Sequence, residues 1–193
     1  GRENVRYVVM DLSNGYRSLV QKLFPNAFII GDKFHVVRLF SPLIMKTGKE
    51  LFGHRQQLFW RRLLLKNRAK LSYETRFEID RRLVPHPVLR EIYHWKNRID
   101  GFYRIRGWQR ACRTFPKIVE QMKQSELPAI RRLAQTLKRW QEPILQHFEH
   151  KLTNAATEAI NNLAKIVQRR GFGYKSFRNY RIRTLSACLV RSF

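Results

Sequence analysis

Two aspartates stand at the ends of short apolar runs near the start of the sequence. Asp11 follows YVVM, and Asp32 closes the segment FIIG. A carboxylate at the end of a strand can be a ligand for a hard divalent cation such as Mg²⁺, which prefers oxygen. It can also be an ordinary turn or helix-capping residue. Both interpretations are open on the residues alone, and Asp32 is well placed to cap a helix over KFHVVRLF.

The elements around these acids are predicted to be a strand, a helix and a strand. RYVVM and NAFII are β-branched and of strand length, whereas Tyr16, Val20 and Phe24 recur at a spacing of four between them. A connection of this length makes the two strands parallel. Asp11 and Asp32 should then leave the same edge of a sheet, about 5 Å apart laterally if the strands are neighbours. Proteins of α/β type place their chemistry at that edge.

The middle of the chain is predicted to be helical. From FHVVRLF to the segment ending in ILQHFE, apolar residues recur at spacings of three and four with basic residues between them. Prolines should mark helix ends, first turns or kinks. The tryptophans are expected to pack these helices against one another, with wedging between DNA bases as the alternative for one of them: Trp60, Trp95, Trp108 and Trp140.

The last forty residues have a different character. TNAATEAINNLAKIVQRRG is typical of a helix with Thr153 or Asn154 as its N-cap and Gly171 as its end. Glu158 and Asn162 are one turn apart, so their side chains should project side by side. This helix therefore presents a carboxylate next to an amide.

A basic and aromatic segment follows that helix. RRGFGYKSFRNYRIR, residues 169–183, holds six Lys or Arg residues and four aromatic ones. Alternating cations and flat rings suit the binding of phosphates and unstacked bases. The alternative is that Phe172, Phe177 and Tyr180 pack a core beneath a solvated basic face. The predicted DNA-binding residues are Arg169, Arg170, Tyr174, Lys175, Arg178, Arg181 and Arg183.

The overall charge points to a polyanionic partner. Thirty-nine Lys and Arg against fourteen Asp and Glu give a net charge of +25, and such a field attracts nucleic acid first and anionic membranes second. The membrane is disfavoured, because no window approaches the roughly 18 apolar residues that span a bilayer. Cys112 and Cys188 are far apart and are expected to be reduced thiols of a cytoplasmic protein. The chain starts without Met and almost directly with a strand, which suggests a segment of a longer protein.

The residues together resemble a known family. The motifs D-x-S from Asp11, F-P-N-A, D-K-F-H from Asp32, T-N-x-x-x-E-x-x-N-N from Thr153, and G-F-G-Y from Gly171 are similar to those of the catalytic region of bacterial insertion-sequence transposases of the ISL-three type. The resemblance covers essentially the whole chain, and it is carried by the combination of motifs. It implies a DDE transposase with a ribonuclease-H-like core.

The resemblance also implies a reaction and its residues. In DDE transposases three carboxylates hold two divalent ions, Mg²⁺ or Mn²⁺, for cleavage and transfer of DNA strands. The ions activate the attacking oxygen and stabilise the leaving oxygen. Asp11 and Glu158 are the expected catalytic and metal-binding residues. Asp32, His35 and Asn162 are expected accessory residues, with a structural role as the alternative for His35.

The simplest count would take Asp11, Asp32 and Glu158 as the complete triad. The resemblance argues against it, because the first aspartate of a ribonuclease-H-like fold lies on a strand followed by an antiparallel meander, and only 20 residues separate Asp11 from Asp32. Asp11 is then expected to be the second carboxylate, and the first one to lie upstream. On this hypothesis the chain is a fragment that binds DNA and cleaves it poorly or not at all.

The predicted fold is α/β and mostly α, the second half of a ribonuclease-H-like core interrupted by a large all-helical insertion. Residues 1–40 form the strand–helix–strand part, residues 41–152 the insertion, and residues 153–193 the helices with the third carboxylate and the basic segment. The predicted function is transposition of an insertion sequence in the bacterial cytoplasm, on element ends and target DNA, by a homodimer or higher assembly. The alternative is a non-catalytic nucleic-acid-binding module or the remnant of a transposase.

Overall fold

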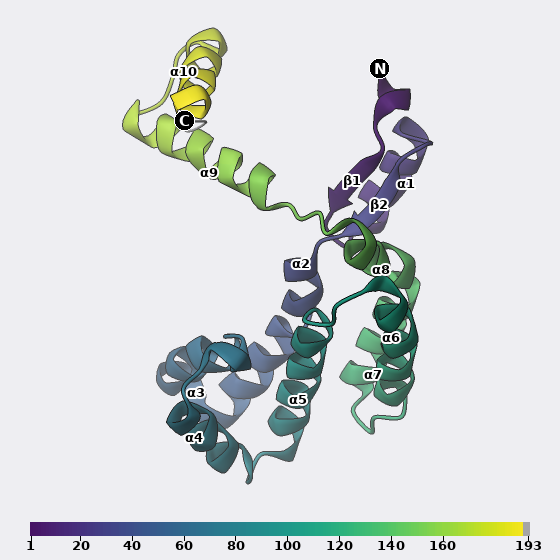
Figure 1. Cartoon of the computed structure of the whole chain (residues 1–193). Helices are drawn as coiled ribbons and strands as arrows, with labels where there is room; N and C mark the ends of the chain where they lie inside the picture. The colour runs from purple at the N-terminus through teal and green to yellow at the C-terminus, as the bar shows by residue number, and fades with distance from the viewer. Residues whose placement is uncertain (191–193) are drawn as a thin grey trace. The chain divides into compact units, whose positions relative to one another are not determined.

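The computed structural model describes residues 1–190, without the side chains of residues 54–59, 156 and 190. The chain divides into two compact units, Gly1–Leu152 and Thr153–Phe193. The first unit holds a small sheet and a series of helices, and the second holds the helices α9 and α10 (Figure 1). The described part of the chain is mostly helical, in agreement with the predicted balance of helix and strand.

The sheet is formed by the first strand–helix–strand segment. Strand β1 (Tyr7–Met10) pairs in parallel with strand β2 (Phe28–Gly31), and helix α1 (Asn14–Leu23) connects them. A short 3₁₀ helix, η1 (Arg2–Asn4), precedes β1. Val and Ile dominate both strands because branched side chains pack well on a pleated surface. The predicted parallel pairing is confirmed.

The strand register brings both acids to one edge of the sheet. Met10 pairs with Gly31, and the backbone N–H of Asp32 donates to the carbonyl of Met10 at 3.0 Å. The ladder therefore runs to the last residue before each carboxylate. Asp11 and Asp32 leave the same carboxyl edge, as the sequence predicts.

The helices of the first unit follow directly after β2. They are α2 (Lys33–Arg38), α3 (Ser41–Leu64), α4 (Tyr73–Leu83), α5 (Pro87–Phe102), α6 (Trp108–Lys123), α7 (Pro128–Arg139) and α8 (Gln141–His150), with the 3₁₀ helix η2 (Arg68–Lys70) between α3 and α4. Helix α8 packs against β2, and α6 packs against both α7 and α8. The sheet edge is thus supported by the helical region.

Prolines and one glycine account for several of these boundaries. Pro42, Pro87 and Pro128 stand in the first turns of α3, α5 and α7, where a missing N–H costs no helical hydrogen bond. Pro116 lies inside α6. At Gly53 the backbone leaves the helical region, with φ 67° and ψ 176°, so α3 consists of two helical pieces joined at a residue that tolerates positive φ.

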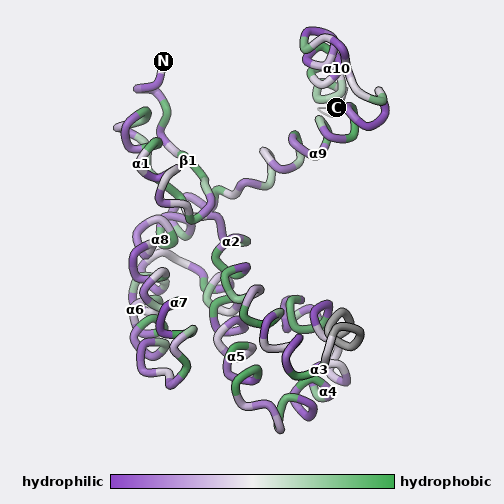
Figure 2. Tube along the Cα trace, turned by 180° about the vertical axis from the view of Figure 1, so that it is seen from behind, coloured by the Kyte–Doolittle hydropathy of each residue, from purple (hydrophilic) through white to green (hydrophobic). Residues whose placement is uncertain are grey.

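The core of the first unit lies between the amphipathic helices. Figure 2 shows hydrophobic and hydrophilic residues alternating along α5 and α6, and the apolar faces of these helices are buried. Trp60, Trp95 and Trp140 are buried among them, as expected. Trp108 is 45% exposed, so its predicted packing role is wrong. It is the first residue of α6, and the buried residues of that helix begin one turn later, at Ala111.

The second unit is a pair of helices joined by a glycine-rich turn. Helix α9 (Ala155–Arg170) follows the N-cap Asn154 and ends at Gly171, and helix α10 (Phe177–Val190) follows the turn. Phe172 and Gly173 both adopt positive φ, 48° and 96°. The predicted helix and its end are confirmed.

The aromatic residues of the turn do not form a core in the described chain. Phe172 is fully exposed and Phe177 is 75% exposed. The packing interpretation is therefore wrong for these two residues. Tyr180 is half-buried and contacts the ring of Tyr174, with ring centroids 5.5 Å apart. The turn thus presents open aromatic faces next to its basic residues.

Two smaller expectations concern the thiols and the membrane. Cys112 is a free thiol, as predicted. Within the described residues, no helix combines the length and the apolar character needed to cross a bilayer.

Candidate active site

The carboxylates that follow β1 and β2 meet at the ring of His35. The Nδ1 atom of His35 lies 3.0 Å from Oδ1 of Asp11 and 3.0 Å from Oδ2 of Asp32. The three side chains come from different places: the end of β1, the end of β2 and the first turn of α2. His35 therefore joins the two acids and fixes the position of the Asp11 carboxylate relative to the sheet.

Asp32 is the buried member of this group. Its Oδ2 accepts hydrogen bonds from the backbone N–H groups of Phe34 and His35, at 3.1 and 3.3 Å, which is the N-cap arrangement for α2. The residue is 1% exposed, and its Oδ1 is buried with no hydrogen-bond partner. The prediction that Asp32 caps the following helix is confirmed, and one carboxylate oxygen remains unused by the cap.

Two residues of the helical region lie close enough to influence Asp32. Tyr103, at the end of α5, packs its ring against His147 of α8, with centroids 5.4 Å apart. Burial, and then the negative charge of Asp32, raises the pKa of Tyr103. The Tyr103 hydroxyl is buried and has no hydrogen-bond partner. The sequence analysis missed Tyr103, because nothing in its spacing relates it to a carboxylate 71 positions earlier in the chain.

His147 was also missed as part of this region. Burial lowers its pKa, against the opposing effect of its contact with the carbonyl of Leu152, while Lys33 lowers and Asp32 raises it to smaller extents. Nδ1 of His147 lies 3.1 Å from that carbonyl oxygen. The motif HFEH gives no ligand set, so only the fold relates His147 to the acids.

The donor chemistry of this edge fits a hard divalent cation at Asp11. The Asp11 side chain is 47% exposed, so it is accessible to an ion that prefers carboxylate oxygen. The unpartnered Oδ1 of Asp32 is a second oxygen at the same edge. Over the described residues, no group of three or more His, Cys, Asp or Glu side chains has the arrangement of a metal site. The described residues thus offer an accessible carboxylate at Asp11 and a buried one at Asp32, and they form no complete metal site.

The predicted third carboxylate lies in the second unit. Glu158 stands in the first turn of α9, and both Glu158 and Asn162 are exposed on that helix. Contacts within the first unit bring Asp11, Asp32 and His35 together, and Glu158 and Asn162 are one turn apart on α9 in the second unit. The assignment of Glu158 as a metal ligand stays a prediction.

The predicted DNA-binding residues are distributed over the turn and the two helices beside it. The basic members of the set are all exposed, and Tyr174 is half-buried, with its hydroxyl donating to the carbonyl of Val167 at 3.3 Å. A pocket of about 520 Å³ lies between the turn and α10. Its lining includes Tyr174, Lys175 and Arg183. Basic side chains and an aromatic ring therefore line the same pocket.

The chain combines acids at the edge of a parallel strand pair with helices that are rich in Lys and Arg. This combination is expected of an enzyme that works on nucleic acid. The model of the ISL3 family of DDE transposases, described as "Transposase", matches residues 1–184. The chain belongs to this transposase family.

A curated relative supports the same assignment. The transposase for insertion sequence element IS1001 of Bordetella parapertussis is 29% identical to this chain over 191 residues. The match covers 90% of this chain and 45% of the relative, so the chain spans about half the length of that protein. No solved structure matches the chain.

The dual role of Asp32 leads to a first prediction. Replacing Asp32 by Ala removes the acceptor of two backbone N–H groups and of His35, and we expect a loss of about 1–2 kcal/mol of unfolding free energy. Asp32→Asn keeps an oxygen at the cap and should lose less. Urea unfolding followed by tryptophan fluorescence measures this, because all four tryptophans lie in the first unit. Asp11→Asn is the matched control at an exposed carboxylate, and equal midpoints for Asp32→Ala and the control would contradict the prediction.

The lowered pKa of His147 leads to a second prediction. The folded protein binds a proton at His147 less readily than the unfolded chain does. The stabilisation by neutral His147 is therefore complete above the unfolded pKa of about 6.5 and is lost as the pH falls toward the folded pKa. The unfolding free energy should decrease between pH 7.5 and pH 5, and decrease less in His147→Gln. A constant difference between the two proteins over this range would show that His147 does not titrate as described.

Proposed function

We propose that this chain forms the part of an insertion-sequence transposase that supplies two catalytic carboxylates, Asp11 and Glu158, and binds the DNA. The reaction is metal-dependent cleavage of DNA strands at the element ends, followed by strand transfer into target DNA. The observation that carries the proposal is the contact of Asp11 and Asp32 with one histidine at the carboxyl edge of parallel strands, in a chain of the transposase family. That edge is where α/β proteins place their chemistry.

The core proposed for the complete protein is ribonuclease-H-like. Tyr7, Tyr16, Leu19 and Phe28 are large apolar side chains exposed on β1, α1 and β2, and additional strands would cover such residues. β1 has one described strand partner, β2. We infer that further strands pair with β1 and that one of them carries the first catalytic aspartate. The helices between α2 and α9 are then the insertion.

Each residue of the proposed site has a distinct task. Two Mg²⁺ or Mn²⁺ ions, when bound, supply activation of the attacking oxygen and stabilisation of the leaving oxygen. Asp11 and Glu158 provide carboxylate oxygens for these ions. His35 holds Oδ1 of Asp11, and the buried Asp32 holds His35 in turn. Asn162 lies one turn after Glu158 and offers an amide to the same side of α9.

The basic segment after α9 is proposed to hold the DNA. Its exposed Lys and Arg residues suit phosphate contacts, and Phe172 and Phe177 offer exposed rings for unpaired bases. Salt should weaken this binding steeply, because each phosphate contact releases counterions. Since transposition joins two element ends, we propose that the complete protein acts as a homodimer or a higher assembly.

A non-catalytic nucleic-acid-binding module is the second candidate. It is favoured by the structural use of Asp32, whose Oδ2 is taken up by the helix cap and by His35. In such a module Asp11 and Glu158 would also be structural or solvated residues. Dependence on metal separates the two candidates.

The test is DNA binding by the whole 193-residue chain with and without Ca²⁺ or Mg²⁺, on a duplex that carries the terminal sequence of its element. We expect several-fold tighter binding with the ion. Asp11→Asn and Glu158→Gln should lose this gain, because each removes a carboxylate ligand. The exposed Glu149→Gln is the charge-matched control and should keep it.

Two outcomes would contradict parts of this account. Binding that ignores the ion in all four proteins favours the non-catalytic module. Metal-dependent nicking by this chain alone, abolished by Asp11→Ala, would show that no further aspartate is required and that the assignment of Asp11 as the second carboxylate is wrong.

A further inference from the structure

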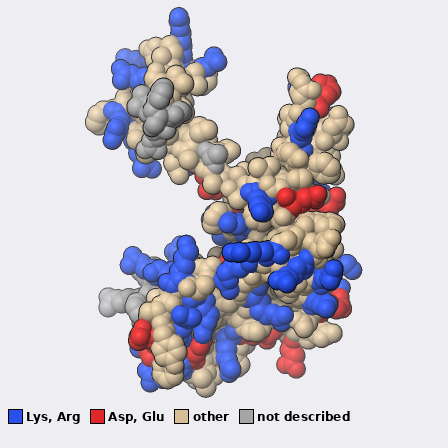
Figure 3. Space-filling view, viewed as in Figure 1, with Lys and Arg blue, Asp and Glu red and all other residues tan. Residues whose placement is uncertain are grey.

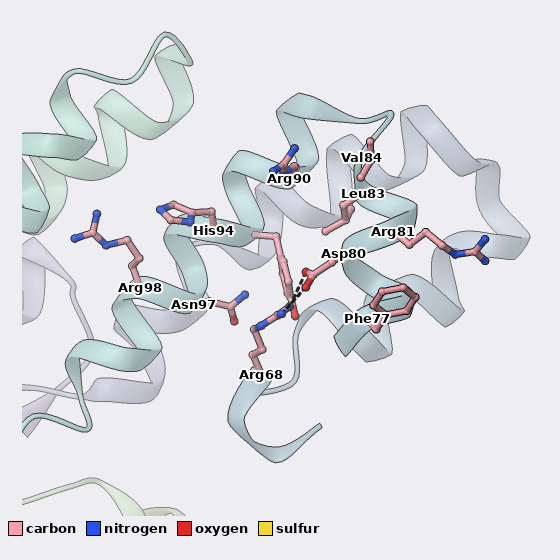
Figure 4. A pocket seen from close by; sticks show the side chains of 11 residues that line it. Arg68, Phe77, Asp80, Arg81, Leu83, Val84, Arg90, His94, Asn97 and Arg98 are labelled. Carbon is pink, nitrogen blue, oxygen red and sulfur yellow. Dashed lines mark hydrogen bonds and ion pairs between the residues drawn. The ribbon is translucent and has the colours of Figure 1, made fainter. Parts of the chain in front are cut away.

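A large pocket lies between α4 and α5, in the helical region. Its volume is about 720 Å³, and its lining includes four arginines and one carboxylate, Asp80. The arginines are Arg68, Arg81, Arg90 and Arg98. Figure 4 shows Arg68 joined to Asp80, with Arg90, His94 and Arg98 following one another along α5.

Two of these arginines are paired with acids. Arg68 donates to both oxygens of Asp80, at 2.8 and 2.5 Å. Arg81 donates to both oxygens of Glu78, at 3.1 and 3.3 Å, and Glu78 also pairs with Arg82. The charge of Arg68 is therefore offset by Asp80, and that of Arg81 in part by Glu78.

Arg90 and Arg98 are in a different situation. Neither forms an ion pair with any residue that the structure describes, and Arg98 lies over the ring of Trp95 at 5.3 Å from its centroid. The two acids of the same helix are engaged elsewhere: Glu91 accepts hydrogen bonds from Trp95 and Ser125, and Asp100 forms an ion pair with Lys96. The positive charge of Arg90 and Arg98 is therefore uncompensated.

The pKa of His94 is lowered in part by this charge. His94 stands between the two arginines on the same face of α5, because residues four apart on a helix are neighbours. Its pKa is lowered by partial burial, then by repulsion from Arg98 and, more weakly, from Arg90, with Glu91 opposing. The side of the pocket formed by α5 is thus a site of concentrated positive potential.

We propose that this pocket binds the phosphate backbone of duplex DNA through Arg90, His94 and Arg98. The inference rests on the proposed DNA-binding function and adds a second contact surface, in the helical region, to the segment at residues 169–183. For this region the sequence analysis considered DNA contact only as the alternative role of one tryptophan, and for none of these three residues.

An extended polyanion fits the pocket better than a small anion does. From residue 90 to residue 98 a helix advances about 12 Å, a length that faces on the order of three phosphates along one DNA strand. Lys and Arg side chains also gather over the helices of the first unit on the face drawn in Figure 3, so the helical region offers further positive charge to a bound strand.

The test is the binding of a duplex DNA to the whole chain at several salt concentrations. Arg90→Gln/Arg98→Gln should weaken binding by about 10-fold or more near 0.1 M salt and flatten the plot of log K against log salt by about two units. Arg110→Gln/Arg113→Gln, which removes the same charge from the exposed face of α6, is the matched control. It should change affinity no more than about threefold.

A second readout is independent of variant folding. The pKa of His94 in the unaltered chain, followed by NMR, should rise when the duplex is added, because bound phosphates offset the repulsion from Arg98 and Arg90.

Equal affinities of the two double variants, with an unchanged pKa of His94, would overturn this inference and leave the proposed function intact. Absence of DNA binding by the unaltered chain would instead overturn both. A rise of the His94 pKa with inorganic phosphate alone, and none with the duplex, would replace DNA by a small anion and also overturn it.

Discussion

The parallel pairing of β1 with β2 is the constraint on which the arrangement of the acids depends. The last hydrogen bond of the ladder joins the N–H of Asp32 to Met10, so the residues after both strands emerge at the same edge. From there the cap made by Asp32 begins α2, and α2 places His35 against Asp11. A shift of β2 by one residue relative to β1 would turn the side chains of β2 to the opposite face of the sheet and would separate Asp32 from Asp11.

Charge is the second organising feature of the molecule. Fourteen acids face thirty-nine basic residues, and several of these acids are held in ion pairs with Lys or Arg: Asp80 with Arg68, Glu78 with Arg81 and Arg82, Asp100 with Lys96, and Glu120 with Lys123. Among the described residues, Asp11 and Asp32 form ion pairs with His35 and with no Lys or Arg. The acids at the sheet edge are therefore not taken up by a basic side chain, which suits a site that must accept metal ions beside DNA.

Much of this arrangement could be predicted from the sequence, because it depends on local patterns. Short β-branched runs predict β1 and β2, a spacing of four predicts α1, and the position of Asp32 before KFHVV predicts its cap. Tyr103 and His147 could not be found in this way, since their relation to Asp32 exists only after α5 and α8 have packed. The pocket on α5 was missed for a similar reason: basic residues are so frequent in this chain that only the ion pairs of the fold distinguish Arg90 and Arg98 from Arg68 and Arg81. Trp108 was wrongly placed because composition does not indicate which end of a helix is covered.

The claim that Asp11 binds a divalent ion is tested most directly by Mn²⁺, a paramagnetic substitute for Mg²⁺, added to the chain in the absence of DNA. The ring signals of His35, whose Nδ1 lies 3.0 Å from Asp11, should broaden at low Mn²⁺ concentration, whereas those of His94 stay sharp. Asp11→Asn should abolish the broadening. Sharp His35 signals in the unaltered chain, or broadening that persists in Asp11→Asn, would contradict the account.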